Sequence, residues 1–176
     1  MMDWNLSIVQ SLAASRTPFG LSFFSHMTEF GGLAVTVVVL VVAMLLLWRG
    51  RSWAHSLGLL VALGGATIVA HILKIALAFP RPDQGYHAVI ENGYSFPSAH
   101  AAAAMALYGF LAWYVWEIYP RWGIPASLLF GILIMTIGFS RVYLGVHFPT
   151  DVIVGFAIGA VFIWIGATIT ARLERF

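Results

Sequence analysis

Three short strings of polar residues stand out in an otherwise apolar chain. They are Lys74-x6-Arg81-Pro82, Pro97-Ser98-Ala99-His100 and Ser140-Arg141-x5-His147-x3-Asp151. The chain is 61% hydrophobic and only 9% charged, so it offers few places where ionisable side chains are well solvated. Burying a charged group is costly unless a partner or a ligand compensates it. The strings therefore indicate a site where these side chains do chemistry.

The basic residues of the strings indicate an anionic ligand. They form a cation cluster of three residues: Lys74, Arg81 and Arg141. A guanidinium matches phosphate oxygens with its planar fork, and an ammonium adds a point charge. A helix that begins near Pro97 would add unpaired N–H groups and the positive end of its dipole, and Ser98 could donate a further hydrogen bond. Together these groups favour a phosphate, with no metal ion or other cofactor needed to neutralise it.

The two histidines of the strings suggest phosphoryl transfer. One of His100 and His147 could attack phosphorus, and the other could protonate the leaving oxygen. Asp151 follows His147 by four residues and could hold one ring nitrogen as N–H, which leaves the other free to attack. A divalent metal bound by His147 and Asp151 is an alternative, since both residue types coordinate such ions. The nearby cations would repel a metal, which favours the metal-free interpretation.

Composition places the chain among integral membrane proteins. Its 176 residues suffice for one domain, expected here to cover residues 1–176. The chain has no cysteine, which excludes disulfides and thiolate chemistry. Its net charge of +2 is too small to suggest nucleic acid as a partner. The expected surroundings are a lipid bilayer, and the oligomeric state cannot be read from the sequence.

The apolar segments predict an all-α bundle of about five transmembrane helices within residues 31–170. A helix needs about 20 residues to cross the hydrocarbon core, and the segment 124–139 falls slightly short of that length. Pro80 and Pro82 should end the second helix, and Pro97 suits the first position of the third. The segments are approximately 31–48, 54–79, 97–119, 124–139 and 149–170.

Residues 1–30 are too polar to span a membrane. We expect an interfacial amphipathic helix that is followed by a turn at Pro18 and Gly20. The alternative is a frayed N-terminal tail, since chain termini are often disordered.

The basic residues outside the strings predict the orientation of the bundle. With five spans, one side of the membrane carries five of the nine Lys and Arg residues: Arg49, Arg51, Arg121, Arg172 and Arg175. The positive-inside rule makes that side cytoplasmic. The same span map brings the three strings together on the other side. We therefore expect a multi-pass protein of the cell membrane whose site faces the extracytoplasmic side.

The three strings resemble the signature of the type 2 phosphatidic acid phosphatase superfamily. That signature reads Lys-x6-Arg-Pro, Pro-Ser-Gly-His and Ser-Arg-x5-His-x3-Asp, and every spacing between Lys74 and Asp151 agrees with it. The one departure is Ala99, which stands where the family usually has glycine. Alanine keeps the backbone N–H that is thought to approach the phosphate, but it adds a methyl group to the pocket.

The resemblance implies a role for each residue of the signature. His147 would be the nucleophile that forms a phosphohistidine, and Asp151 would orient it. His100 would protonate the leaving group and then activate water. The phosphate would be bound by Lys74, Arg81, Ser98, the backbone N–H of Ala99, and Arg141.

The resemblance also implies a membrane lipid phosphatase. The small five-span layout is similar to that of bacterial undecaprenyl-diphosphatases, which makes undecaprenyl diphosphate the favoured substrate. Phosphatidylglycerophosphate, phosphatidate and lipid A are the alternatives. A non-catalytic lipid-binding protein is a further alternative, but it would not need both histidines. A vanadate-dependent oxidase is another, but the related vanadium haloperoxidases are soluble, unlike the membrane protein expected here.

Several residues outside the signature receive other interpretations. The loop 83–96 is apolar for a loop, so we expect it to form a lid or lip over a lipid headgroup. His55 has the expected position of a surface or interfacial residue. Glu117, with its aromatic neighbours, is expected to belong to a membrane-interface belt.

Overall fold

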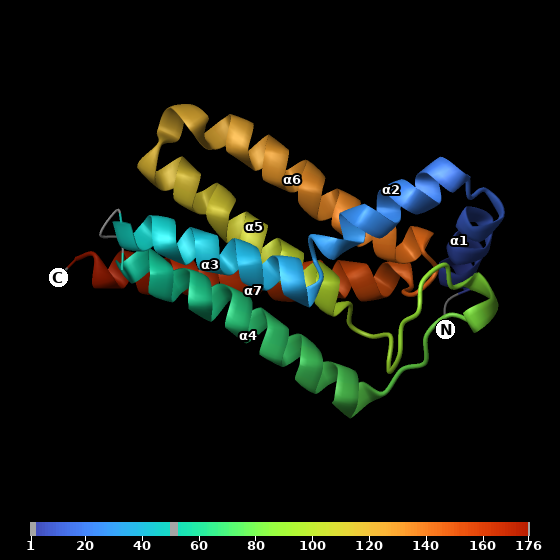
Figure 1. The fold of residues 1–176 in the computed structure, drawn as a ribbon. Helices are drawn as coiled ribbons and strands as arrows, with labels where there is room; N and C mark the ends of the chain where they lie inside the picture. The colour runs from blue at the N-terminus through green and yellow to red at the C-terminus, as the bar shows by residue number, and fades with distance from the viewer. Residues whose placement is uncertain (1–2, 50–52, 176) are drawn as a thin grey trace.

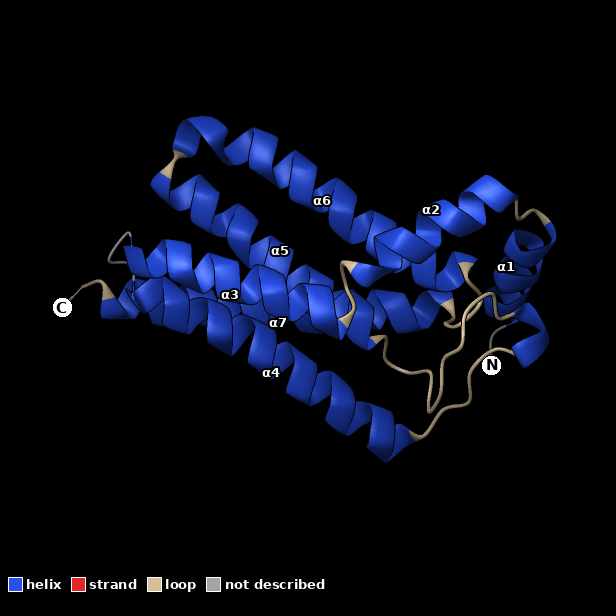
Figure 2. Ribbon diagram, in the orientation of Figure 1, coloured by secondary structure: helices blue, strands red, loops and turns tan. Residues whose placement is uncertain are grey.

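The computed structural model describes residues 3–49 and 53–175, and over these residues it is helical with no strand (Figures 1 and 2). The expected all-α class is confirmed. The elements in chain order are α1 (Asp3–Ala14), α2 (Pro18–Glu29), α3 (Leu33–Arg49), α4 (Trp53–Leu77), the short 3-10 helix η1 (Gln84–Tyr86), α5 (Ala99–Ile118), α6 (Pro120–Tyr143) and α7 (Pro149–Leu173).

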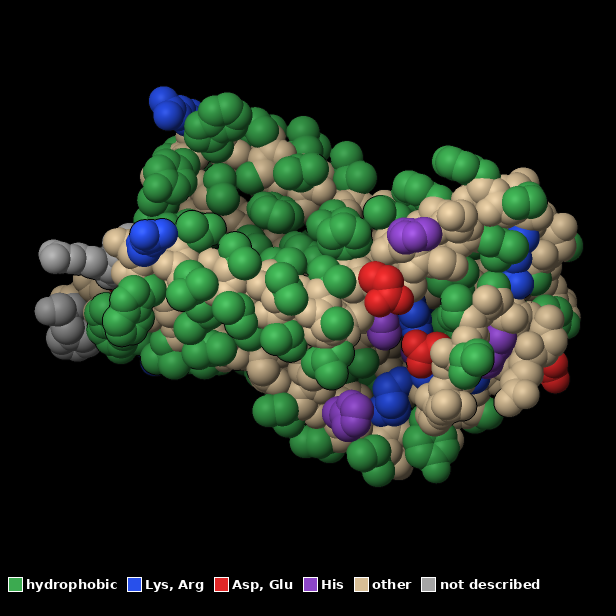
Figure 3. Space-filling model, in the orientation of Figure 1, with side chains coloured by type: hydrophobic (Ala, Val, Ile, Leu, Met, Phe, Trp, Pro, Cys, Tyr) green, Lys and Arg blue, Asp and Glu red, His purple; other side chains and the backbone are tan. Residues whose placement is uncertain are grey.

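Helix α5 forms the centre of the bundle. It packs against α4, α6 and α7, and α4 also packs along α7. Its buried side is rich in alanine, and Ala101, Ala102, Ala104 and Ala106 have no exposed surface. Such small side chains let neighbouring helices approach closely, which suits a bundle whose outer faces lie in lipid. The outer faces carry exposed apolar side chains, as Figure 3 shows along the length of the bundle.

The helices agree with about five membrane spans, but the short one is not the one expected. α6 has 24 residues and begins at Pro120, so it is long enough to cross a membrane. Helices α4, α5 and α7 are also long and apolar enough to cross a membrane. α3 has only 17 residues, so it is long enough to cross a membrane only when it is combined with α2. The two helices are bent by 48° relative to each other.

The N-terminal residues form two docked helices instead of a helix and a turn. Pro18 occupies the first turn of α2, where its fixed φ is favourable, and the Thr17 side chain caps that helix by accepting a hydrogen bond from Gly20 N at 3.0 Å. Gly20 lies inside α2, where the missing side chain leaves room for the Tyr143 hydroxyl that a Cβ would overlap. Val9 of α1 is fully buried. A frayed tail is therefore wrong for residues 3–30.

The three strings meet at the end of the bundle where α4 ends and α5 and α7 begin. α4 ends at Leu77, and Ala78 has a left-handed φ of 50°, two residues before Pro80. The expected position of Pro97 is wrong by two residues, since Ser98 is the N-cap and α5 begins at Ala99. The side chain of Ser98 can cap the helix by accepting an N–H bond, which proline cannot do. Figure 3 shows acidic, basic and histidine side chains gathered toward this end.

Candidate active site

The His147 ring lies between Arg81 and Asp151. Its Nε2 is 3.2 Å from Arg81 Nη1, and its Nδ1 is 3.3 Å from Asp151 Oδ2. A guanidinium only donates hydrogen bonds, so Nε2 must be the acceptor and Nδ1 must carry the proton. The lone pair of Nε2 therefore faces the cation cluster, which is the tautomer that a histidine nucleophile needs.

The surroundings of His147 also keep its ring uncharged. Only 2% of the residue is exposed. Burial lowers the pKa of His147 well below its ordinary value of 6.5, and the charges of Arg141, Arg81 and Lys74 lower it further. A neutral imidazole at neutral pH can attack an electrophile without first losing a proton.

Asp151 is fixed by three donors at one carboxylate oxygen. Its Oδ2 accepts a hydrogen bond from Phe148 N at 2.8 Å and another from Ser95 Oγ at 2.5 Å, besides facing His147. Ser95 is fully buried, and its Oγ is 3.4 Å from His147 Nδ1. Sequence reasoning missed Ser95, because it lies outside the strings and its only signal is that it precedes Pro97 by two residues.

Lys74 and Arg81 are bonded to the loop that follows them. Lys74 Nζ donates to the carbonyl oxygens of Tyr94 at 2.8 Å and Ser95 at 3.2 Å. Arg81 donates to the carbonyl oxygen of Gly93 through Nε at 3.1 Å, and through Nη1 to the carbonyl of Val146 at 2.8 Å. The bonds to Tyr94, Ser95 and Gly93 hold the loop 83–96 against the site, and all four bonds fix the direction of the two cations.

Arg141 is the most buried member of the cation cluster, with 2% of the residue exposed. Its Nη1 donates to Thr28 Oγ1 of α2 at 2.8 Å, and its Nη2 forms an ion pair with Glu91 Oε1. The second oxygen of Glu91 lies 3.3 Å from Arg81 Nη2. Sequence reasoning missed Glu91, whose carboxylate contacts both arginines that were assigned to phosphate.

The charge state of Glu91 follows from these contacts. Burial alone would raise its pKa, but the charges of Arg141, Arg81 and His100 and the hydrogen bond from Arg141 outweigh burial and lower it. Glu91 is therefore a carboxylate anion held between two guanidinium groups.

The residues of the second string lie at the start of α5. Ser98 Oγ accepts a long hydrogen bond of 3.5 Å from Ala101 N, and Ser98 N donates to the Asp151 carbonyl at 3.0 Å. The second bond ties the start of α5 to the first turn of α7. His100 is close enough to act electrostatically on both Glu91 and His147. The first N–H groups of α5, including that of Ala99, have no partner within the helix and can bind an anion.

Two cavities border this group of side chains. One, of about 370 Å³, reaches Asp151 and is otherwise lined by Phe79, Pro80, Phe96, Phe148 and Thr150. The other, of about 730 Å³, lies along the loop from Pro80 to Tyr94 and includes Arg81 and Glu91. An apolar cavity next to a charged one suits a ligand with a hydrocarbon part and an anionic part.

The structure thus brings all the signature residues to one end of the bundle. His147, Asp151, Arg81 and Arg141 are linked by direct or shared contacts, with Lys74 and His100 within electrostatic range. The arrangement offers a neutral nucleophile, a second histidine and a group of cations.

Comparisons with known proteins agree with this arrangement. Residues 55–175 match the family model described as the PAP2 superfamily. The chain is 28% identical to phosphatidylglycerophosphatase B of Bacillus subtilis, over 97% of this chain and 85% of that protein. It is 32% identical to the decaprenylphosphoryl-5-phosphoribose phosphatase of Mycobacterium tuberculosis, over 86% of this chain and 81% of that protein.

A solved structure has the same fold over nearly the whole chain. It is the transmembrane PAP2 type phosphatidylglycerolphosphate phosphatase from Bacillus subtilis, with a TM-score of 0.88 and 26% identity. The match covers 98% of this chain and 87% of that one.

Proposed function

The chain belongs to the PAP2 superfamily, and we propose that it is a single-domain membrane lipid phosphatase, residues 1–176, that works through a phosphohistidine intermediate without a metal ion. The observation that carries the proposal is the position of His147. Its unprotonated Nε2 faces Arg81, while its Nδ1 faces Asp151. A histidine that served only as a hydrogen-bonding residue of the bundle would not need this tautomer beside three cations.

The first step is the transfer of the phosphoryl group to His147. Nε2 attacks phosphorus, the bond from phosphorus to the lipid oxygen breaks, and His100 gives that oxygen a proton. Asp151 stabilises the positive charge that develops on the His147 ring. The cation cluster, Ser98 and the first N–H groups of α5 stabilise the equatorial oxygens of the transition state.

The second step returns the enzyme to its starting state. His100, now neutral, takes a proton from a water molecule as that water attacks phosphorus. The bond from phosphorus to His147 Nε2 breaks, and inorganic phosphate leaves. Both histidines end in their original protonation states.

We propose phosphatidylglycerophosphate as the first substrate to test. The proteins named for this activity match almost the whole chain, both in sequence and in structure. Undecaprenyl diphosphate, which the sequence resemblance favoured, becomes the main alternative, followed by phosphatidate and lipid A. The apolar cavity beside Asp151 supports a lipid substrate but does not choose among these headgroups.

We also propose that the site faces the extracytoplasmic side of the cell membrane. Among the described residues, Arg49, Arg121 and Arg172 lie at the end of the bundle opposite to the site, which supports a cytoplasmic position for that end. Arg51 lies outside the described residues. Labelling of single cysteines introduced into the loop 83–96 with a membrane-impermeant thiol reagent would test the orientation.

The function is tested by measuring phosphate release from purified protein on a panel of these lipids with EDTA present. We expect release in EDTA, and a loss of at least about a thousandfold in His147→Ala. His26→Ala is the matched control, because the one hydrogen-bond contact of His26 among the described residues is with the Ser22 carbonyl of its own helix, so the rate should not change. Radiolabelled lipid should leave acid-labile label on the wild-type protein. Absence of release from every lipid would favour a non-catalytic lipid-binding protein.

A further inference from the structure

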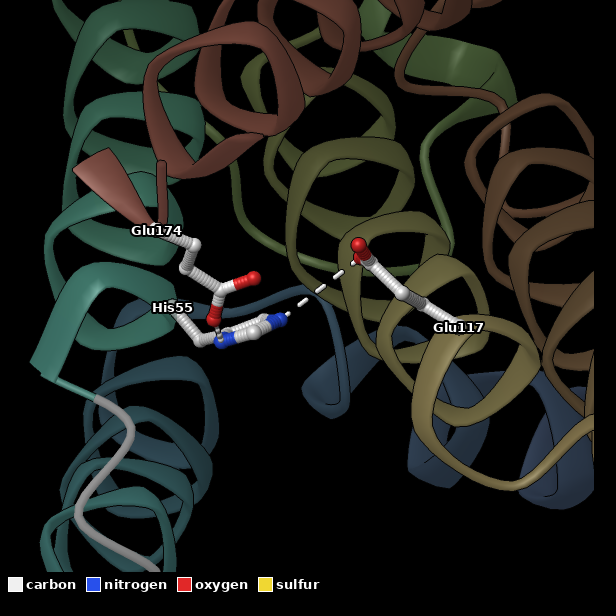
Figure 4. A group of neighbouring side chains, drawn as sticks. All are labelled: His55, Glu117 and Glu174. Carbon is white, nitrogen blue, oxygen red and sulfur yellow. Dashed lines mark ion pairs between the residues drawn. The ribbon is translucent and has the colours of Figure 1, made fainter. Parts of the chain in front are cut away.

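Three side chains converge at the end of the bundle opposite to the phosphate site. They are His55 at the start of α4, Glu117 at the end of α5 and Glu174 just after α7, and Figure 4 shows them facing one another. One potential ligand atom from each lies within 4.8 Å of the others. His55 was expected to be a surface or interfacial residue, but it is buried inside the bundle with none of its side chain exposed.

The His55 ring is held firmly but has no hydrogen-bond partner among residues 3–49 and 53–175. It stacks on Trp113 and packs edge-on against Tyr114, with centroid distances of 5.7 and 4.9 Å. Both ring nitrogens are buried without a hydrogen bond to any described residue. Glu174 Oε1 is 3.0 Å from Nδ1 and Glu117 Oε2 is 3.6 Å from Nε2, but neither approach has hydrogen-bond geometry. Burying an imidazole whose ring nitrogens make no hydrogen bond destabilises the fold unless a ligand binds one of those nitrogens.

We propose that His55, Glu117 and Glu174 bind a divalent transition-metal ion, and we choose Zn²⁺ as the probe. Imidazole nitrogen and carboxylate oxygen are ligands of Zn²⁺, and three protein ligands leave a further position for water. The ion would also balance the charges of the two carboxylates.

Binding the ion requires the two glutamate side chains to move toward His55 and toward each other. Ligand atoms about 2.1 Å from a tetrahedral Zn²⁺ lie about 3.4 Å apart, so a spread of up to 4.8 Å must shrink by roughly 1.4 Å. Glu117 and Glu174 are 33% and 42% exposed, so their side chains have room to turn. His55 would stay in place as the fixed ligand.

The surrounding helices would hold the ligands in position. Thr170 Oγ1 of α7 donates to the Ala54 carbonyl of α4 at 3.2 Å, directly beside His55. A Cβ at Gly166 would overlap the Gly58 carbonyl, so the backbones of α7 and α4 lie very close together here. A bound ion would join the ends of three helices at a rigid point of the bundle.

The test measures Zn²⁺ binding to tag-free protein by calorimetry and by metal analysis after dialysis. We expect one ion per chain in the wild type, removable with EDTA. Glu117→Gln and Glu174→Gln should each weaken binding by at least about tenfold, and the double variant should lose it. At a hundredfold excess over Kd, Zn²⁺ should raise the wild-type unfolding temperature by about 5 to 10 °C and leave the double variant unchanged.

Controls separate this cluster from the phosphate site. Asp83→Asn removes one carboxylate at the other end of the bundle, and His147→Ala removes the active-site imidazole; both should bind Zn²⁺ like the wild type. The proposal is overturned if the wild type binds no Zn²⁺ or if the double variant binds it equally well.

Discussion

Glu91 forms an ion pair with Arg141 inside the group of cations that would bind phosphate. Its other carboxylate oxygen lies 3.3 Å from Arg81 Nη2, so one loop anion contacts two arginines at once. A phosphate that bound both guanidinium groups would compete with this carboxylate. The loop 83–96, which the sequence led us to expect as a lid, thus carries an anion that a phosphate bound to both arginines would displace.

Glu91→Gln should strengthen the binding of inorganic phosphate. Glutamine keeps the size of the side chain but removes the competing charge, and a charge-assisted bond is about twice as strong as a neutral one. We expect the inhibition constant for phosphate to fall by about tenfold, measured by competition against a lipid substrate.

The matched control is Asp83→Asn, which makes the same charge change in the same loop. Asp83 Oδ1 accepts a bond from Gly85 N, which asparagine can also do, and it is not paired with the arginines. This variant should leave phosphate inhibition unchanged. Equal inhibition in Glu91→Gln and the wild type would mean that Glu91 moves away from the arginines before phosphate arrives.

Ser95→Ala should lower kcat by roughly 10- to 100-fold while KM changes little, as is typical when a side chain that orients a reacting group loses its partner. The Ser95 hydroxyl donates to Asp151 Oδ2 at 2.5 Å, and its hydrogen-bond contacts among the described residues are with Asp151 and His147. Ser98→Ala is the contrasting variant, since Ser98 is proposed to bind phosphate and its loss should raise KM. If Ser95→Ala raised KM with kcat unchanged, Ser95 would bind substrate rather than hold Asp151.

The pH dependence of kcat/KM should reflect the uncharged state of His147. Attack requires a neutral ring, and burial followed by the charges of Arg141 and Arg81 lowers the pKa of His147 below 6.5. The acid-side fall in kcat/KM should therefore have an apparent pKa below 6.5. An acid-side pKa above 6.5 would contradict a buried nucleophile surrounded by cations.

The same shift predicts how stability changes with pH. In the unfolded chain, a histidine takes up its proton near pH 6.5, whereas His147 in the folded chain does so only at lower pH. The unfolded state then binds more protons, so the free energy of unfolding should fall as pH decreases below about 6.5. His147→Gln should reduce this slope when unfolding is followed in detergent.

The sequence predicted the helices and the signature residues because both depend on local patterns. Long apolar segments determine the spans, and fixed spacings identify His147 and Asp151 without knowledge of the fold. The extent of α6 was harder to predict, because Pro125 is compatible with a helix interior near its start. Gly20 was expected in a turn, but it lies in a helix like Pro125. Its role is to let α2 approach Tyr143, which is distant in the sequence.

Ser95, Glu91 and His55 could not be predicted from local patterns. Each gains its importance from a contact with a residue far away in the chain, such as Ser95 with Asp151 or Glu91 with Arg141. A serine or glutamate in a loop is ordinary in sequence, and only the packing of the loop against the helix ends brings its side chain to the site.

Gly145→Ala should destabilise the protein and lower its activity, because Gly145 holds the short connection from α6 to α7 that carries His147. Its φ is +77°, which alanine adopts at a cost of about 1 to 3 kcal/mol. A Cβ there would also overlap the Tyr86 carbonyl and lie 2.7 Å from Arg16 Nη2. Gly131→Ala is the matched control, since Gly131 lies in α6 with open space around its Cβ position, and its unfolding temperature should stay equal or rise. Thermal unfolding and kcat of both variants provide the check, and a Gly145→Ala protein as stable and active as the wild type would show that this connection tolerates rearrangement.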